Sequence, residues 1–251
     1  MTPVELLGLI PTAVGVLLLV AVTTVALALY GVSGIWAPAL AIVRGVVQLA
    51  VISLILGGII TSPLWIAVAL LVMFSVAVGV AGRRIGMSPR SLLVMGSSIA
   101  AGVFVAAISV FGSGALAGTP RYALAMGAIV IGNSMNIATL TGRHLGAAVG
   151  DHWDEVEGWL ALGATPRRAT RDLARRAVRE SLIPSIDQTK TTGLVVLPGA
   201  FVGAIFGGLS PLEAGRFQII VLAAIMAAGA VTAVLVATWQ GSVAVKAGPP
   251  D

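Results

Sequence analysis

Long runs of apolar residues, separated by short turn-forming segments, dominate this chain. Seven runs come close to the roughly 20 apolar residues that a helix needs to cross a bilayer. They lie at Leu6–Tyr30, Ile35–Ile59, Pro63–Ala81, Ser91–Phe111, Arg121–Thr141, Thr192–Gly208 and Ala214–Trp239. Glycine, serine and proline gather between the runs, as expected of turns. The pattern predicts an all-α fold, a polytopic membrane bundle of about seven transmembrane helices.

Composition agrees with lipid as the solvent of this fold. Hydrophobic residues make up 58% of the 251 residues and charged residues 10%, and the mean hydropathy is +1.04. A soluble globular domain is nearer half apolar and a quarter charged. A chain so poor in polar side chains could not cover its surface against water, so we expect a multi-pass protein of the cell (plasma or inner) membrane.

Basic residues are spread unevenly among the connections between the runs. The net charge is +5, but most arginines lie between Arg143 and Lys190, so we expect no nucleic-acid partner. Three arginines follow the third run, many more follow the fifth, and Lys246 follows the seventh, whereas the other connections hold almost none. Because positive loops stay in the cytoplasm, this alternation predicts an N-terminus outside and a cytoplasmic C-terminus.

The segment from Gly142 to Lys190 is the only long polar stretch of the sequence. Four acidic residues gather where a first short helix would begin, which suits the helix dipole. Gly163 then permits a sharp turn, and Pro166 suits the first turn of a second, basic helix that we expect to end around Pro184. Charge alone favours a simple interpretation, a solvated loop whose arginines fix the topology and touch anionic lipid.

The order of several motifs indicates a more specific role. Glu157, followed by Leu162-Gly163-Ala164-Thr165-Pro166, resembles the coupling loop of ABC transporter permeases, a helix-turn-helix that sits in a cleft of the ATPase subunit. Further motifs recur in this order in one family: Gly132-Asn133-Ser134-Met135-Asn136, Leu160-Ala161-Leu162-Gly163-Ala164-Thr165-Pro166, Ile183-Pro184 and Leu197-Pro198-Gly199. The chain thus resembles the FetB-type (iron export) ABC transporter permease family, which includes the plant aluminium-sensitivity permeases.

The resemblance implies one transmembrane permease domain over residues 1–251, with a cytoplasmic coupling loop at 142–190. It implies an exporter linked to metal (iron) homeostasis or resistance, with an ABC ATPase subunit, membrane lipid and a second permease copy as partners. The residues that would couple to the ATPase are Glu157, Trp159, Leu162, Gly163, Ala164, Thr165 and Pro166. The chain departs from many bacterial members at residues 200–204, where they have a methionine-rich run.

Polar residues within the apolar runs are candidates for the translocation pathway, because ionisable groups inside a membrane are costly and usually functional. The candidates are Arg44, Gln48, Asn133, Asn136, Asp187 and Lys190. Simpler interpretations exist for each. Arg44 can snorkel to the surface, the asparagines can join helices, and Asp187 can form an ion pair with Lys190 at the start of a helix.

A face of small residues follows in the sixth run. Pro198, Gly199, Gly203 and Gly207 are spaced for close helix packing, for example across a dimer axis. The alternative is a bent helix that lines the pathway, since proline removes a backbone hydrogen bond.

The sequence offers no energy source of its own. No Gly-x-x-x-x-Gly-Lys-Ser/Thr motif occurs, and we recognise no catalytic triad and no metal-ligand spacing. We therefore expect no enzyme, no cofactor and no metal site in this chain, with ATP and magnesium on the partner ATPase. An ion-coupled secondary transporter or channel working without an ATPase stays open, as does a membrane anchor. The substrate, whether iron, another cation or a nucleotide sugar, is also open.

Overall fold

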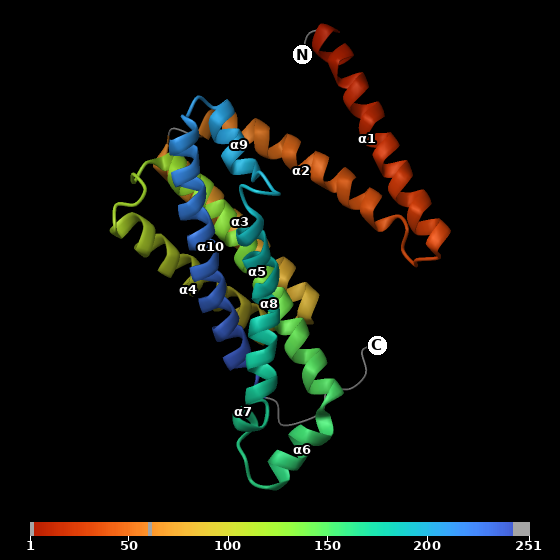
Figure 1. Ribbon diagram of the computed structural model, residues 1–251, viewed down its shortest axis with the longest axis vertical. Coiled ribbons are helices and arrows are strands. Elements are labelled where there is room, and N and C mark those ends of the chain that lie inside the picture. Colours follow the sequence, from red (N-terminus) through yellow and green to blue (C-terminus); the bar gives the residue numbers. More distant parts are fainter. Residues whose placement is uncertain (1–2, 60–61, 243–251) are drawn as a thin grey trace. The chain divides into compact units, whose positions relative to one another are not determined.

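The computed structural model describes residues 3–59 and 62–242, with side chains for residues 10–53 and 62–242. The described chain is helical apart from turns and one isolated bridge between Thr192 and Val196 (Figure 1). The helices are α1 (Pro3–Tyr30), α2 (Ala37–Ile59), α3 (Pro63–Ile85), α4 (Pro89–Gly112), α5 (Pro120–Asp151), α6 (Trp153–Ala161), α7 (Pro166–Ala169), α8 (Arg171–Thr191), α9 (Gly199–Phe206) and α10 (Pro211–Gln240). The chain divides into two compact units, Met1–Ile60 and Thr61–Asp251.

The first unit consists of α1 and α2. α1 has 28 residues and accommodates Pro11 in its first half. The short turn after Tyr30 is closed by a bond from the Ala37 amide to the Gly34 carbonyl oxygen, 2.9 Å long. Most described side chains of both helices are exposed and apolar, and none is buried. In a bilayer these surfaces meet lipid or other protein rather than water.

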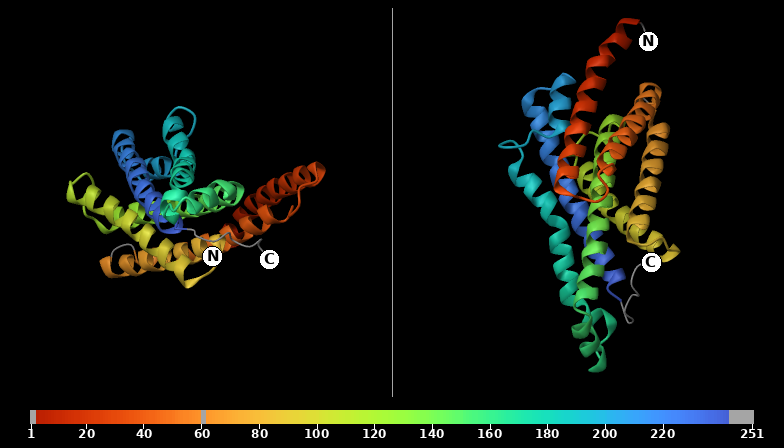
Figure 2. Two further views of the ribbon diagram at one scale, coloured as in Figure 1. Left: turned by 90° about the horizontal axis from the view of Figure 1, so that it is seen from below. Right: turned by 90° about the vertical axis from the view of Figure 1, so that its right-hand side faces the viewer.

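The second unit is built around α10. This helix packs along α4, α5 and α8, and α5 also packs against α3. Figures 1 and 2 show α8 running back beside α5, after α6 and α7 have reversed the chain at one end of the unit. The core is made of small and medium apolar side chains, such as Ala106, Val130, Val221 and Ala228. Small side chains let membrane helices approach closely, because packing there depends on contact rather than on the exclusion of water.

α4 and α10 approach so closely at Gly102 that no side chain fits between them. A Cβ atom at this position would overlap the carbonyl oxygen of Ala228 and the hydroxyl of Thr232. Thr232 donates that hydroxyl to the Ser98 carbonyl oxygen, 3.2 Å away, and so joins the two helices. Because one of the obstructing atoms belongs to the backbone, a side-chain rotation cannot relieve the overlap.

We expect Gly102→Ala to destabilise the protein by about 1–3 kcal/mol, the usual cost of overpacking a core. Gly79→Ala is the matched control, because a Cβ there would meet no atom within 4 Å. The control gains about 1 kcal/mol of helix propensity, so it should be as stable as the parent protein or more stable. Thermal unfolding in detergent measures both variants, and an unchanged midpoint for Gly102→Ala would contradict this packing.

The all-helical membrane fold is confirmed. Within the described residues, five helices are long and apolar enough to cross a membrane, namely α1, α3, α4, α5 and α10. α2 adds a shorter apolar stretch, Ala37–Ser53. These six helices coincide with six of the seven predicted runs.

The remaining run, Thr192–Gly208, is not a single helix, so this part of the prediction is wrong. The carbonyl oxygen of Thr191 accepts bonds from the amides of residues 194, 195 and 196, at 2.9 to 3.3 Å, and this turn ends α8. Pro198 then precedes α9, which has only 8 residues. Eight helical residues rise about 12 Å, less than half of the hydrocarbon layer.

The predicted polar loop at 142–190 is mostly regular helix. Its first ten residues continue α5 to Asp151, and its second helix runs to Thr191 instead of ending around Pro184. Pro184 lies on the exposed side of α8, so the Glu180 carbonyl that it leaves without a partner is on that side too.

Candidate coupling and translocation site

A small apolar core fixes α6 and α7 to the ends of α5 and α8. Leu145 and Val149 of α5 pack with Val156 of α6 and with Leu173 and Ala177 of α8. All five side chains are buried, and Val156 is 0% exposed. The buried positions of α8, Leu173, Ala177, Ser181 and Ser185, recur every four residues. The reversal between α6 and α7 is therefore a packed element and not a loose connector.

Gly163 ends α6 in a Schellman motif. Its amide bonds the Leu160 carbonyl oxygen at 2.9 Å, and the Ala164 amide bonds that of Trp159 at 3.0 Å. This pair of bonds requires a left-handed residue at Gly163, whose φ is +82°. A Cβ there would meet no atom within 4 Å. The backbone angle, and not a close contact, is what requires glycine.

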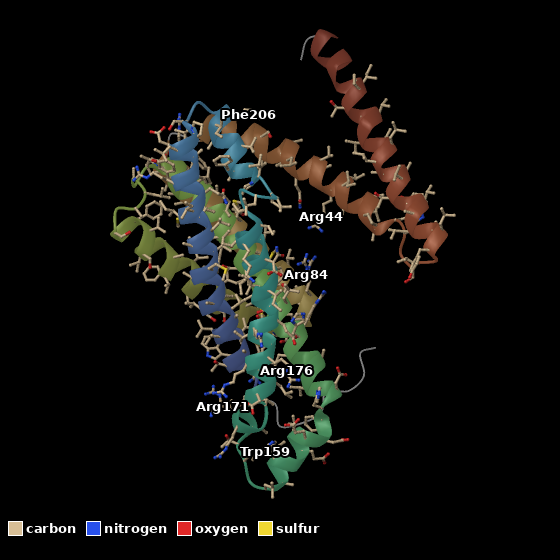
Figure 3. All side chains as sticks on the ribbon, in the orientation of Figure 1. Arg44, Arg84, Trp159, Arg171, Arg176 and Phe206 are labelled. Carbon is tan, nitrogen blue, oxygen red and sulfur yellow. The ribbon has the colours of Figure 1, made fainter. Side chains whose placement is uncertain are left out.

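The residues around this turn form an exposed tip. Leu162 is 82% exposed and Trp159 is 44% exposed, and Glu157 and Thr165 are also exposed. Figure 3 shows Trp159 at the extreme end of the second unit, beyond the end of α10. Two large apolar side chains are thus held outward on a capped turn.

Two side-chain contacts tie α8 to α5 above the tip. Thr141 of α5 donates to the Ser181 hydroxyl of α8, 2.8 Å away and buried. One turn nearer the tip, His144 Nδ1 lies 3.6 Å from a Glu180 carboxylate oxygen. A displacement of the tip would therefore be carried along α8 into the bundle.

The Thr141–Ser181 bond also fixes the levels of four predicted pathway residues. α5 and α8 run in opposite directions, so residues before Thr141 lie at the level of residues after Ser181 (Figure 1). At 1.5 Å per residue, Asn133, Asn136, Asp187 and Lys190 all lie between about 7 and 14 Å from that bond along their helices. These four residues therefore lie at similar levels along the two helices, a zone that we call the polar band. At about 100° per residue they do not share the helix faces that carry the Thr141–Ser181 bond, and the described residues show no hydrogen bond between the asparagines and α8.

The ion pair within this band is present but lies elsewhere than predicted. Lys190 Nζ is 3.4 Å from a carboxylate oxygen of Asp187, with side chains 70% and 60% exposed. The pair lies near the C-terminal end of α8, whereas the sequence predicted it at the start of a helix. Asn133 donates its side-chain amide to the Ile129 carbonyl oxygen of its own helix, 2.8 Å away, and so does not join two helices in the described structure.

Arg44 and Gln48 lie one turn apart on α2, in the first unit, as predicted. Both are exposed within that unit. Their place relative to the polar band is not defined, and their role in the pathway stays a prediction.

The small-residue face of α9 has no partner helix within the described part of this single chain. Cβ atoms at Gly199 or Gly203 would meet nothing within 4 Å. Gly207 caps α9 through its amide, which bonds the Gly203 carbonyl oxygen at 2.9 Å. Packing of this face between two copies of the chain stays a prediction.

The polar contacts that join helices were missed by the sequence analysis. Thr141 with Ser181 and Thr232 with Ser98 connect residues 40 and 134 positions apart. A third links the Thr170 hydroxyl to the Gly241 carbonyl oxygen. Serine and threonine usually bond their own helix, so nothing in the local sequence marks these residues. Among the described residues, no three His, Cys, Asp or Glu side chains gather closely enough to hold a metal ion.

A bundle of membrane-crossing helices with an exposed, capped turn beyond one end defines a multi-pass integral membrane protein. The comparisons make the class specific. The family model described as "Uncharacterised protein family (UPF0014)" matches residues 11–243, and the chain belongs to this family.

Curated relatives cover between 49% and 78% of the chain. "UPF0014 membrane protein STAR2" of Oryza sativa is 41% identical over 197 residues, 78% of this chain and 69% of the relative. "Protein ALUMINUM SENSITIVE 3" of Arabidopsis thaliana is 39% identical over 193 residues, 76% and 71% of the two chains. "Probable iron export permease protein FetB" of Escherichia coli is 36% identical over 124 residues, 49% and 47%. No solved structure matches the chain. The predicted family resemblance is confirmed.

Proposed function

We infer that this chain is the transmembrane permease subunit of an ABC-type exporter, and that it acts as a homodimer with a separate ATPase subunit. We take iron as the substrate, because one relative is named a probable iron export permease. ATP and magnesium are bound by the partner, and this chain itself carries out no chemical reaction. Its site of action is the cell membrane.

The observation that carries this proposal is the capped turn at Gly163. A subunit without a nucleotide site must receive movement through a contact surface, and the surface must be stiff to transmit it. The turn meets both needs, because Trp159 and Leu162 face outward while a buried core fixes α6 to α5 and α8. The long α8 then leads from this turn to the polar band.

The sixth crossing of the membrane is made by α8, the turn after Thr191 and α9 together. α9 lies beside the first part of α10, and Ala200 packs on the core that contains Phe217. The broken crossing supports a pathway, because irregular backbone at membrane depth is tolerated where it lines water or is covered by protein. With this crossing the chain spans the membrane seven times, with the N-terminus outside and the C-terminus in the cytoplasm.

The orientation is tested by cysteine labelling, since the sequence contains no cysteine. Asp172→Cys, near the start of α8, should react with an impermeant reagent only in permeabilised cells. Ala117→Cys, in the exposed connection before α5, should react in intact cells and is the matched control. Labelling of position 172 in intact cells would reverse the proposed topology.

The function is tested by purification and flux. We expect a tagged version of this chain to purify with an ATPase subunit from its own organism, and reconstituted liposomes to move ferrous iron only with ATP. Iron movement without any ATPase would favour the secondary transporter or channel. Co-purification and stimulated ATP hydrolysis without iron movement would keep the class and change the substrate to another cation or a nucleotide sugar.

A further inference from the structure

A basic groove lies between the start of α8 and the end of α10, and Thr165, at the edge of the exposed tip, is part of its lining. The groove has a volume of about 760 Å³. Four arginines, two threonines, an alanine and a valine form one side, and the end of α10 contributes the other. The lining residues used below are Arg168, Arg171, Arg175, Val178, Val234 and Thr238.

The arginine side of the groove carries excess positive charge. Arg175 is 3.2 Å from Asp172, but neither Arg168 nor Arg171 has an ion pair within residues 10–53 and 62–242. Arg171 is also the first residue of α8, where the helix dipole adds positive potential. The groove is held in shape by the bond from the Thr170 hydroxyl to the Gly241 carbonyl oxygen, which joins the two helix ends.

The α10 side of the groove marks the edge of the membrane. Trp239 neighbours Thr238 and is 37% exposed, as is typical of indoles at the membrane interface. Val234, one turn into the apolar part of α10, is 52% exposed. The groove is therefore open to hydrocarbon at Val234 and carries its arginines at the level of the lipid headgroups. Figure 3 shows Arg171 next to the lower end of α10.

We propose that this groove binds the headgroup of an anionic phospholipid, with an acyl chain lying along Val234 and Val178. Basic pockets between helices at the membrane surface recognise such headgroups, and Arg matches phosphate oxygens in bidentate geometry. The ATPase is a less suitable occupant, because the exposed apolar tip lies farther from the membrane than the groove does. The proposal needs only the membrane location of the bundle, so it stands or fails separately from transport.

The test compares two pairs of arginines on one stretch of chain. The full-length protein is first incubated with phosphatidylglycerol or with phosphatidylcholine and is then transferred into a neutral detergent. Native mass spectrometry counts the lipid molecules that stay bound to each protein. Arg168→Gln/Arg171→Gln removes two charges from the groove. Arg176→Gln/Arg179→Gln removes two exposed charges of α8 that do not line it.

We expect the parent protein and the control pair to retain phosphatidylglycerol in preference to phosphatidylcholine, and the groove pair to lose that preference by about tenfold or more. Thr238→Glu, which adds an acid opposite the arginines, should also lower the preference for phosphatidylglycerol. Equal losses from both pairs would mean diffuse surface charge and would overturn the proposal. Displacement of the lipid by an equal concentration of inorganic phosphate would reduce the groove to a simple anion site.

A separate readout excludes a protein partner. If the groove pair kept its lipid preference but no longer purified with the ATPase, the groove would be a docking surface for protein and the lipid assignment would be wrong. The melting temperatures of all variants should match the parent protein, because Arg168 and Arg171 are exposed.

Discussion

Gly163→Val is expected to abolish ATP-driven transport while leaving the helical bundle folded. The φ of +82° at Gly163 is a conformation that a β-branched residue avoids, at a cost of about 1–2 kcal/mol or more. The Schellman bonds that end α6 would be lost, and Trp159 and Leu162 would no longer point outward together. The measurements are co-purification of the ATPase and transport-linked hydrolysis in liposomes.

A graded series separates this explanation from a general loss of stability. Gly163→Asn should retain part of the activity, because asparagine tolerates the left-handed region better than valine does. Gly158→Ala should behave like the parent protein, since Gly158 lies within α6 and a Cβ there meets no atom within 4 Å. Normal coupling in Gly163→Val would show that this turn does not connect to the ATPase.

Charge near the turn should matter much less than its shape. Arg168 and Arg171 are exposed, and a surface charge contributes only about 0–1 kcal/mol to a contact of this kind. We therefore expect their glutamine variants to keep the ATPase bound. This distinction also keeps the coupling turn and the lipid groove experimentally separate.

The sequence predicted those helices that are long, uninterrupted apolar runs. α3, α4, α5 and α10 are long apolar runs between glycine- and proline-rich turns, and hydropathy alone locates such helices. The run from Thr192 to Gly208 was misjudged because mean hydropathy is insensitive to a turn. The break there depends on backbone bonds to the Thr191 carbonyl oxygen and on the absence of an amide hydrogen at Pro198. Both features are local, and averaging the hydropathy over the whole run hides them.

The site was predictable only where its geometry is local. Gly163 could be singled out because a helix end followed by Gly-Ala-Thr-Pro requires a left-handed residue, although the sequence could not separate backbone angle from close contact. The Thr141–Ser181 bond could not be foreseen, because its two hydroxyls are 40 residues apart and depend on the register of two packed helices. That register, in turn, is what places Asn133 and Asp187 at one level.

Asp187→Leu is the second substitution expected to abolish transport. The Asp187–Lys190 pair is 3.4 Å long and more than half exposed, yet it lies beside α5 about 20 Å from the first residue of that helix. On the proposed topology, in which α5 enters the membrane at its outer end, this level lies within the roughly 30 Å hydrocarbon layer. Charges exposed at that depth must face water or another copy of the chain, because facing lipid costs about 2.5–3.5 kcal/mol each.

The double variant distinguishes a pathway from a structural ion pair. If the pair only stabilises the end of α8, Asp187→Leu leaves Lys190 unpaired, and Asp187→Leu/Lys190→Leu should restore transport by removing both charges. If the pair lines the pathway, the double variant should be as inactive as the single one, because the polar surface that the substrate meets is gone. Asp172→Leu breaks a similar exposed pair lower on α8, 3.2 Å long, and should transport normally. We expect an inactive double variant that still inserts and purifies with the ATPase, and restored iron flux would contradict the placement of the pathway at this band.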